Sequence, residues 1–142
     1  MKYELDFASK NDIDLLKNYK LKSILDYAKD ITPEEKNKII NYVDNNISKD
    51  IKLYKTIKVA GKISGCVLLT RKNNDLLLDE LFIDEEYRGN WIGTSIINNI
   101  IKDNQDVHLW VYKENKNAIK LYKKLGFKIK EETETRYYMY HE

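Results

Sequence analysis

The apolar residues of this chain change their spacing partway along it, and this change constrains the fold most strongly. Up to about residue 50 they recur every three or four positions, as at Ile39, Val43 and Ile47, which is the spacing of one helix face. From Ile51 onward they form short runs separated by glycine and asparagine, which is typical of strands joined by turns. A chain of this order predicts a mixed α/β domain.

The first half of the chain carries the clearest helix signal. Thr32 is placed to cap a helix, Pro33 suits its first position, and Glu35 falls at the third, so a helix is predicted over 33–47. Apolar residues between positions 13 and 28 predict one or two further helical turns before it.

The remaining elements follow from alternation and turn residues. Gly61-Lys62 and Asn73-Asn74 are expected to be turns that join three strands into an antiparallel meander, and Gly126 is expected to end the last helix. The predicted strands cover residues 2–7, 51–59, 63–70, 76–83, 107–111, 127–131 and 136–140, and two later helices cover 92–101 and 115–125.

Composition limits the class of protein and its partners. The 142 residues suit one domain, and 42% hydrophobic with 34% charged residues is the composition of a globular protein. The sequence has no apolar stretch long enough for a membrane span and no apolar core of a signal peptide. We therefore expect a soluble cytoplasmic protein with no membrane partner. The 25 basic and 23 acidic residues are interspersed, which argues against a nucleic-acid partner. One cysteine, Cys66, and two histidines argue against a metal site.

The stretch from Leu81 to Thr94 is the most informative about function. A buried strand leads through the acidic turn 84–86 into a glycine-containing loop that opens a helix. Backbone N–H groups in such a loop, together with the helix dipole, form a site suited to a pyrophosphate. The alternative is an ordinary loop whose glycines only satisfy turn geometry, because glycine motifs alone are not specific.

A second segment, residues 111–127, also bears on function. Within it, Ala118 and Tyr122 lie four residues apart and share one helix face. In this order and at this separation, the two segments resemble the GNAT superfamily of acyl-CoA-dependent N-acetyltransferases. The family's pyrophosphate motif, Arg/Gln-x-x-Gly-x-Gly/Ala, fits at Arg88, Ile92 and Gly93, although Trp91 stands where its first glycine is usual. Its later motif is matched at Asn115, Ala118, Tyr122, Gly126 and Phe127, and the segment 63–66 is similar to its central hairpin.

The resemblance implies a fold and a way of binding acetyl-CoA. The fold is a single domain over residues 1–142, with a central mixed, mostly antiparallel sheet flanked by helices. The backbone of 88–94 is expected to hold the pyrophosphate, and the strand edge at 81–83 the pantetheine arm, where an N–H near Phe82–Ile83 stabilises the oxyanion. The residues expected to bind acetyl-CoA are Leu81, Phe82, Ile83, Arg88, Gly89, Asn90, Trp91, Ile92, Gly93, Thr94, Asn115 and Tyr122.

Three residues are candidates for the chemistry. Tyr122 is expected to protonate or stabilise the departing coenzyme thiolate, with simple packing as the alternative. Asp79 and Glu80 face opposite sides of their predicted strand, and either is a candidate to take the proton of the acceptor amine, directly or through water. The alternative to a catalytic role is that one of them only pairs with a surface lysine. Asn115 either contacts the cofactor or only caps its helix, and Cys66 is expected to be buried and unreactive.

The activity implied by the resemblance is acetyl transfer from acetyl-CoA to a primary amine. The acceptor is expected to be a polyamine-like small molecule, an amino sugar or a protein N-terminus. A non-catalytic acyl-CoA-binding or interaction domain on the same fold is the competing expectation, and Trp91 is its best support. The aromatic stretch 137–140 is either an edge strand that pairs two copies into a homodimer or part of the core.

Overall fold

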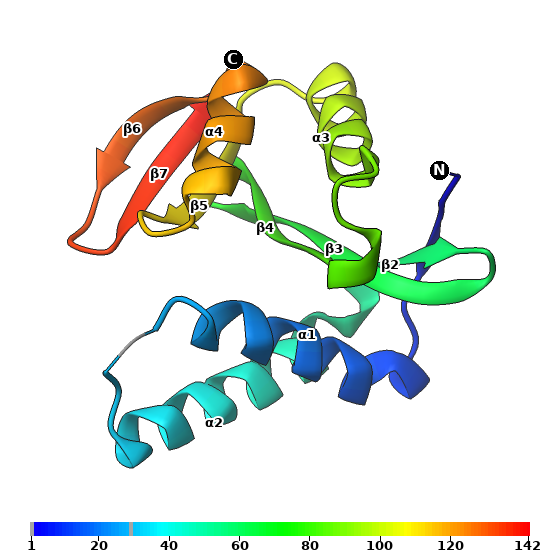
Figure 1. Ribbon diagram of the computed structural model, residues 1–142, viewed down its shortest axis with the longest axis vertical. Helices are drawn as coiled ribbons and strands as arrows, with labels where there is room; N and C mark the ends of the chain where they lie inside the picture. The colour runs from blue at the N-terminus through cyan, green and yellow to red at the C-terminus, as the bar shows by residue number, and fades with distance from the viewer. Residues whose placement is uncertain (1, 29) are drawn as a thin grey trace. The chain divides into compact units, whose positions relative to one another are not determined.

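The computed structural model describes residues 2–28 and 30–142 (Figure 1). Their contacts form two compact units. The N-terminal unit contains Lys2–Leu68 and Glu80–Glu85, and the C-terminal unit contains Leu69–Asp79 and Glu86–Glu142. The helices are α1 (Ile13–Leu25), α2 (Pro33–Asp50), α3 (Ile92–Asp103) and α4 (Lys116–Lys124). The strands are β1 (Glu4–Phe7), β2 (Tyr54–Val59), β3 (Lys62–Lys72), β4 (Asp75–Ile83), β5 (Val107–Tyr112), β6 (Lys128–Glu132) and β7 (Arg136–His141).

The strands form one seven-stranded sheet in the order β1-β2-β3-β4-β5-β7-β6. β1 and β3 pair antiparallel with β2, and β7 pairs antiparallel with β5 and β6. β4 and β5 run parallel, with Leu76 opposite Val107 and Leu77 opposite His108. The expected mixed, mostly antiparallel sheet is therefore confirmed, and α3 supplies the crossover that a parallel pair requires.

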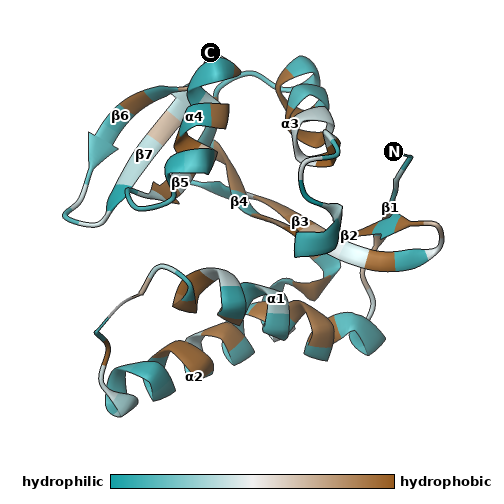
Figure 2. Cartoon of the chain, in the orientation of Figure 1, coloured by the Kyte–Doolittle hydropathy of each residue, from teal (hydrophilic) through white to brown (hydrophobic). Residues whose placement is uncertain are grey.

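The N-terminal unit buries the apolar faces of α1 and α2. Figure 2 shows their apolar residues as bands between polar ones along each helix. The predicted start of α2 is confirmed, because the Thr32 hydroxyl accepts a hydrogen bond of 3.1 Å from the Glu35 N–H and Pro33 is the first helical residue. One cluster of buried residues in this unit consists of Leu16, Tyr19, Val43, Ile47, Ile51, Tyr54, Cys66, Leu68 and Phe82.

The two predicted hairpins are present, with one turn shifted. Asn73 and Asn74 both have positive φ, 52° and 72°, as a two-residue type I′ turn requires. The other turn consists of Ala60 and Gly61, with φ of 52° and 79°, so the expected Gly61-Lys62 turn is wrong by one residue. Lys62 instead begins β3.

Residues 51–53 differ from the expectation of a strand. Ile51–Leu53 continue from α2 as a single 3₁₀ turn, and β2 begins only at Tyr54. Ile51 is buried against the helical core while Leu53 is half exposed, so their apolar character does not reflect strand alternation. Two further 3₁₀ turns, Lys10–Asp12 and Glu85–Tyr87, are too short to leave a periodic signal.

The C-terminal unit places the aromatic stretch 137–140 in an interior strand. β7 lies between β5 and β6, and Met139 at its centre is fully buried. Of the two alternatives for this stretch, the edge strand is therefore wrong, and a strand inside the sheet with a buried centre is found. The edge strand next to β7 is β6, in which all five residues are exposed.

None of the helices formed by the described residues has both the length and the apolar character that crossing a membrane requires.

Candidate functional site

The loop before α3 has an unusual helix start. Trp91 is the N-cap residue, yet within the described chain no side chain caps α3 and no acidic residue lies in its first turn. The first helical hydrogen bond, 2.9 Å long, runs from the Ser95 N–H to the Trp91 carbonyl. The amides of residues 92–94 precede that bond and so have no carbonyl partner within the helix. This end of α3 therefore offers several N–H donors and the positive end of the helix dipole to an anion.

The residues before Trp91 shape the loop. Gly89 has a φ of 80°, a conformation that favours glycine, and an added Cβ there would meet no atom within 4 Å. The Asn90 side-chain amide donates a hydrogen bond of 3.2 Å to the Tyr87 carbonyl. The space beside Gly89 is thus open, and the loop is held by its own hydrogen bond.

Trp91 takes a backbone conformation that normally belongs to glycine. Its φ of 66° lies in the left-handed region, which costs a residue with a Cβ roughly 1–2 kcal/mol. Its side chain is 70% exposed, and the Lys124 Nζ of α4 lies 5.8 Å from the ring centroid. The tryptophan therefore keeps the glycine-like backbone while its ring lies largely in solvent.

The start of α4 is closed by its own side chain. The Asn115 side-chain oxygen accepts a hydrogen bond of 3.2 Å from the Ala118 N–H. Asn115 thus caps the helix, which is one of the two roles expected for it. A contact between Asn115 and a cofactor stays a prediction.

Tyr122 lies on α4 next to Phe127. The Phe127 N–H donates to the Tyr122 carbonyl at 2.9 Å, and the two rings lie 5.7 Å apart between centroids. Among residues 2–28 and 30–142, no group accepts a hydrogen bond from the Tyr122 hydroxyl. Burial raises the pKa of this phenol to about 12, so it stays protonated at neutral pH. The side chain is therefore available as a proton or hydrogen-bond donor.

Asp79 and Glu80 have different surroundings, as neighbours on a strand should. The half-buried Asp79 accepts a hydrogen bond of 3.1 Å from the Thr70 hydroxyl, and its carboxylate lies 3.8 Å from the Lys72 Nζ. Asp79 thus pairs with a lysine, as the purely structural alternative for this residue predicts. Glu80 is only 8% exposed, and its Oε2 accepts a hydrogen bond of 2.5 Å from the Tyr54 hydroxyl.

Cys66 is the second neighbour of Glu80. The thiol is fully buried, and its Sγ lies 3.8 Å from Oε1 of Glu80. Burial, and then the Glu80 carboxylate, raise the pKa of the Cys66 thiol well above its usual value. A thiol that stays protonated is a poor nucleophile, in agreement with the expectation that Cys66 is buried and unreactive.

The strand segment 81–83 is anchored from α1. The Phe82 ring stacks on Tyr19 at 4.6 Å between centroids, and the Tyr19 hydroxyl donates to Asp84 at 3.2 Å. Burial and the Asp84 carboxylate raise the pKa of Tyr19. Sequence reasoning missed Tyr19 and Tyr54, because nothing local separates them from the other tyrosines among the 11 in the chain.

The predicted site residues divide between the two units. Residues 88–94, Asn115, Tyr122 and Asp79 belong to the C-terminal unit, whereas Glu80 and residues 81–83 belong to the N-terminal unit. Within the C-terminal unit, the cation–π contact between Lys124 and Trp91 brings the α3 loop next to α4. Within the N-terminal unit, Glu80 lies among core residues.

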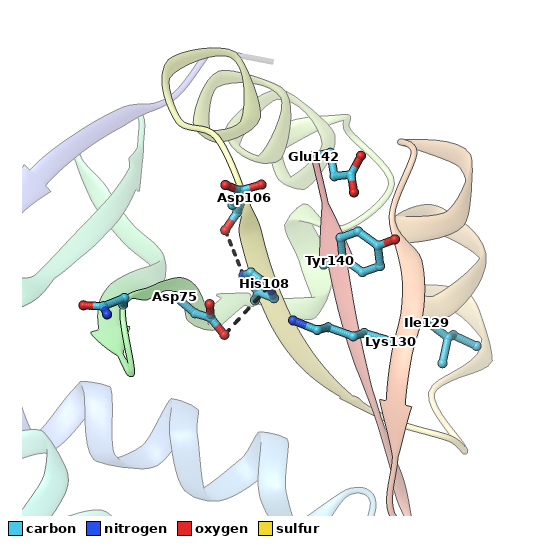
Figure 3. A pocket seen from close by; sticks show the side chains of 8 residues that line it. Asp75, Asp106, His108, Ile129, Lys130, Tyr140 and Glu142 are labelled. Atoms are coloured by element: carbon cyan, nitrogen blue, oxygen red, sulfur yellow. Dashed lines mark hydrogen bonds and ion pairs between the residues drawn. The ribbon is translucent and has the colours of Figure 1, made fainter.

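A separate cavity of about 580 Å³ lies at the starts of β4 and β5 (Figure 3). Nδ1 of the buried His108 lies 2.8 Å from the Asp106 carbonyl, and its Nε2 lies 3.8 Å from the Asp75 carboxylate. None of the residues predicted to bind acetyl-CoA or to act on the acceptor lines this cavity. In the described part of the chain, no three histidine, cysteine or acidic side chains are grouped so as to hold a metal ion.

Comparisons with known proteins concern the family and the fold of the chain. A family model described as an acetyltransferase (GNAT) domain matches residues 54–129, which include β4, the α3 loop and α4. The chain is 46% identical over 59 residues to an uncharacterized N-acetyltransferase of Methanocaldococcus jannaschii. That match covers 38% of this chain and only 26% of the relative, so the chain spans about a quarter of the relative's length.

Solved structures share the fold over nearly the whole chain. The PaiA N-acetyltransferase from Thermoplasma acidophilum, in complex with coenzyme A, has a TM-score of 0.78 and 21% identity, covering 100% of this chain and 99% of that one. A ribosomal-protein alanine N-acetyltransferase from Escherichia coli has a TM-score of 0.69 and 14% identity, with coverages of 99% and 93%. At these identities the likeness concerns the fold alone. Because the family model matches more than half of this chain, residues 54–129, the chain belongs to the GNAT acetyltransferase family.

Proposed function

We propose that residues 1–142 act as one domain, an acetyl-CoA-dependent N-acetyltransferase that moves an acetyl group directly to a primary amine. The match to the GNAT family over residues 54–129 carries this proposal. The open helix start at α3 supports it, because that start lies within the matched segment and is suited to a pyrophosphate.

The residues present fit acetyl-CoA. The amides of Ile92, Gly93 and Thr94 are the donors for the pyrophosphate, and the open space beside Gly89 leaves room for it. The segment 81–83 would hold the pantetheine arm through main-chain hydrogen bonds, as an added strand does. When bound, acetyl-CoA supplies the activated thioester; the amine nitrogen attacks its carbonyl carbon, and the carbon–sulfur bond breaks.

Glu80 is the favoured base for the acceptor amine. A lysine-like amine has a pKa near 10.4, so it must lose a proton before it attacks. Asp79 accepts a hydrogen bond from the Thr70 hydroxyl and lies 3.8 Å from the Lys72 Nζ, so it has the lysine partner that the structural alternative describes. Glu80 is buried, accepts a hydrogen bond from the Tyr54 hydroxyl, and takes the proton directly or through water.

Tyr122 is proposed to act on the leaving group. Thiols have a pKa of about 8.5, so the departing thiolate needs only modest help. The Tyr122 hydroxyl, with its pKa of about 12 and no acceptor among the described residues, can donate a hydrogen bond or its proton to that sulfur.

The acceptor belongs to one of three classes: a polyamine-like small molecule, an amino sugar or a protein N-terminus. The acidic residues 84–86 favour a cationic acceptor, since opposite charges attract such a substrate. The Escherichia coli neighbour, whose described substrate is a ribosomal protein, supports the protein N-terminus as one of the three.

A non-catalytic acyl-CoA-binding domain is the second candidate, and one observation favours it. Trp91 occupies, at a φ of 66°, the position where the family motif usually has glycine. This departure from the motif lies at the helix start proposed to hold the pyrophosphate, and it is the observation that favours a domain without turnover.

The deciding experiment is a calorimetric titration with acetyl-CoA, followed by an amine screen. Dephospho-CoA, which keeps the pyrophosphate, should also bind if the α3 start is the main anchor. Spermidine, glucosamine and a peptide with a free N-terminus represent the acceptor classes, and released thiol reports turnover. Micromolar binding with turnover supports the enzyme, binding without turnover on all three supports the binding domain, and no binding overturns both.

A further inference from the structure

Glu80 is a carboxylate in an otherwise apolar core. It lies on β4 among the buried residues of the N-terminal unit, including Leu68 and Phe82. Burial of a charge is costly unless hydrogen bonds replace its hydration. Each carboxylate oxygen has such a partner, since Oε2 accepts from the Tyr54 hydroxyl at 2.5 Å and Oε1 lies 3.8 Å from the Cys66 thiol.

Tyr54 is fixed in place by its surroundings. It is fully buried as the first residue of β2, directly after the 3₁₀ turn 51–53, and it pairs with Leu68 of β3. The hydroxyl reaches Glu80 from a different strand, 26 residues away in the sequence. A locked ring with one hydrogen bond to a carboxylate oxygen sets the direction in which that carboxylate points.

The other titratable groups near Tyr54 and Glu80 lie on α1 and directly after β4. Lys20 and Tyr19 lie on α1, and Asp84 directly follows β4. Lys20 and Asp84 act electrostatically on the Cys66 thiol with opposite signs, and Tyr19 donates its hydrogen bond to Asp84. Tyr54 thus donates an O–H hydrogen bond of 2.5 Å to Glu80, which is shorter than a normal hydrogen bond, whereas the Cys66 Sγ lies 3.8 Å from that carboxylate.

We propose that Tyr54 is a positioning residue that keeps the Glu80 carboxylate ionised and oriented to take the proton of the acceptor amine. This inference rests on the proposed N-acetyltransferase function. A hydrogen bond donated to a carboxylate favours its ionised form, which is the form that acts as a base. The proton leaves the substrate ammonium group, binds a Glu80 oxygen, and passes to water when the product departs. Cys66 is the weaker second donor, because a thiol donates poorly.

The test compares two buried hydroxyl deletions on the same strand. Tyr54→Phe removes the donor to Glu80 and keeps the ring. Thr56→Val removes the hydroxyl of a residue that is 1% exposed and whose oxygen lies 3.5 Å from the Asp6 carbonyl instead. The ionisation of Glu80 is followed by carbon-13 NMR of its carboxyl group, assigned with Glu80→Gln, so this readout does not depend on catalysis.

We expect the titration midpoint of Glu80 to move to higher pH by about one unit in Tyr54→Phe and to stay in place in Thr56→Val. Equal midpoints in wild type and Tyr54→Phe would overturn the proposal. If Tyr54→Phe does not fold, 3-fluorotyrosine at position 54 keeps the ring and provides a more acidic hydroxyl, so the Glu80 midpoint should move to lower pH; an unchanged midpoint would overturn the proposal.

The activity assay separates this inference from the proposed function. With whichever probe amine the wild type acetylates, the acid limb of kcat/KM should move upward with the NMR midpoint in Tyr54→Phe, while KM for acetyl-CoA stays unchanged. Activity should recover toward the wild-type value as pH is raised. An NMR shift without a matching shift of the limb refutes Glu80 as the base, and absence of turnover in the wild type refutes the proposed function while the NMR result still stands.

Discussion

The starts of α3 and α4 lie in the same unit and differ in one respect. Asn115 closes α4 by accepting a hydrogen bond from the Ala118 N–H, whereas α3 starts at Trp91 with no capping side chain; neither helix has an acidic residue in its first turn. The chain thus satisfies one helix start with its own atoms and leaves donors at the other. A helix start that is left open in this way is suited to an anion supplied from outside.

The largest expected effect comes from closing α3 with a negative charge. Thr94→Glu places a carboxylate in the first turn of α3, where it repels the pyrophosphate, so acetyl-CoA affinity should fall by about 100-fold. Calorimetry measures this loss. Asn117→Glu is the matched control, since it adds the same charge at an exposed position in the first turn of α4 and should leave affinity unchanged. Equal losses in both variants would mean that net charge, not the open end of α3, governs binding.

The second effect concerns Tyr122, whose hydroxyl is the group that α4 is proposed to contribute to the reaction. Tyr122→Phe should lower kcat by about tenfold and leave acetyl-CoA affinity nearly unchanged, because the hydroxyl acts on the leaving group. Tyr138→Phe is the control, since the Tyr138 hydroxyl already donates to Asp75 at 2.9 Å. Unchanged turnover of Tyr122→Phe under saturating substrates would remove Tyr122 from this role.

The same tyrosine gives a pH dependence with a definite sign. Its pKa is about 12 in the folded protein, against about 10 for an ordinary tyrosine, so the folded state holds the proton more tightly. The resulting stability is complete below pH 10 and is lost as pH rises toward 12. Alkaline unfolding of Tyr122→Phe, followed by circular dichroism, should therefore depend less steeply on pH between these values. An identical profile would contradict the raised pKa.

A smaller effect is expected from opening α4. Asn115→Ala removes the cap and should lower the free energy of unfolding by about 1 kcal/mol, which corresponds to a fall in Tm of roughly 2–5 °C. Asn115→Asp keeps a capping oxygen and should retain most of the stability. Calorimetry with acetyl-CoA then separates the two roles of Asn115, because a cap alone leaves affinity unchanged in both variants. Weaker binding in the stable aspartate variant would indicate a contact with the cofactor.

The smallest effect tests the residue that begins α3. Trp91→Gly relieves the cost of a side chain at a φ of 66° but gives up the contact with Lys124, so stability should rise by less than about 1 kcal/mol. Thermal unfolding measures the change. Since the ring is 70% exposed, acetyl-CoA affinity should stay the same. Tighter binding would show that the tryptophan obstructs the loop.

Local chemistry explains which elements could be predicted from the sequence. The start of α2 at Thr32 and Pro33, the cap at Asn115 and the Asn73-Asn74 turn each depend on residues within four positions of one another. The Ala60-Gly61 turn has no such local signal, because alanine does not indicate a positive φ. The sequence predicts a strand at Ile51, because a buried helix extension and a strand both use apolar residues.

Non-local pairing explains what the sequence left open. The hydrogen bond between Tyr54 and Glu80 joins two strands, and the position of β7 inside the sheet depends on the strand order. Neither fact has a local signature. The two adjacent acids at 79 and 80 were equal candidates in the sequence, and only their neighbours, Lys72 for one and Tyr54 for the other, distinguish them.

The exposed strand β6 has a consequence for how the protein behaves in concentrated solution. A free sheet edge is a template on which a strand of another molecule can add, and this is a route to aggregation. In β6, two lysines and two glutamates leave Ile129 as the one apolar side chain, and the register shifts between Ile129 and Glu131. An incoming strand would have to desolvate these charges and match an irregular edge, so β6 resists such growth.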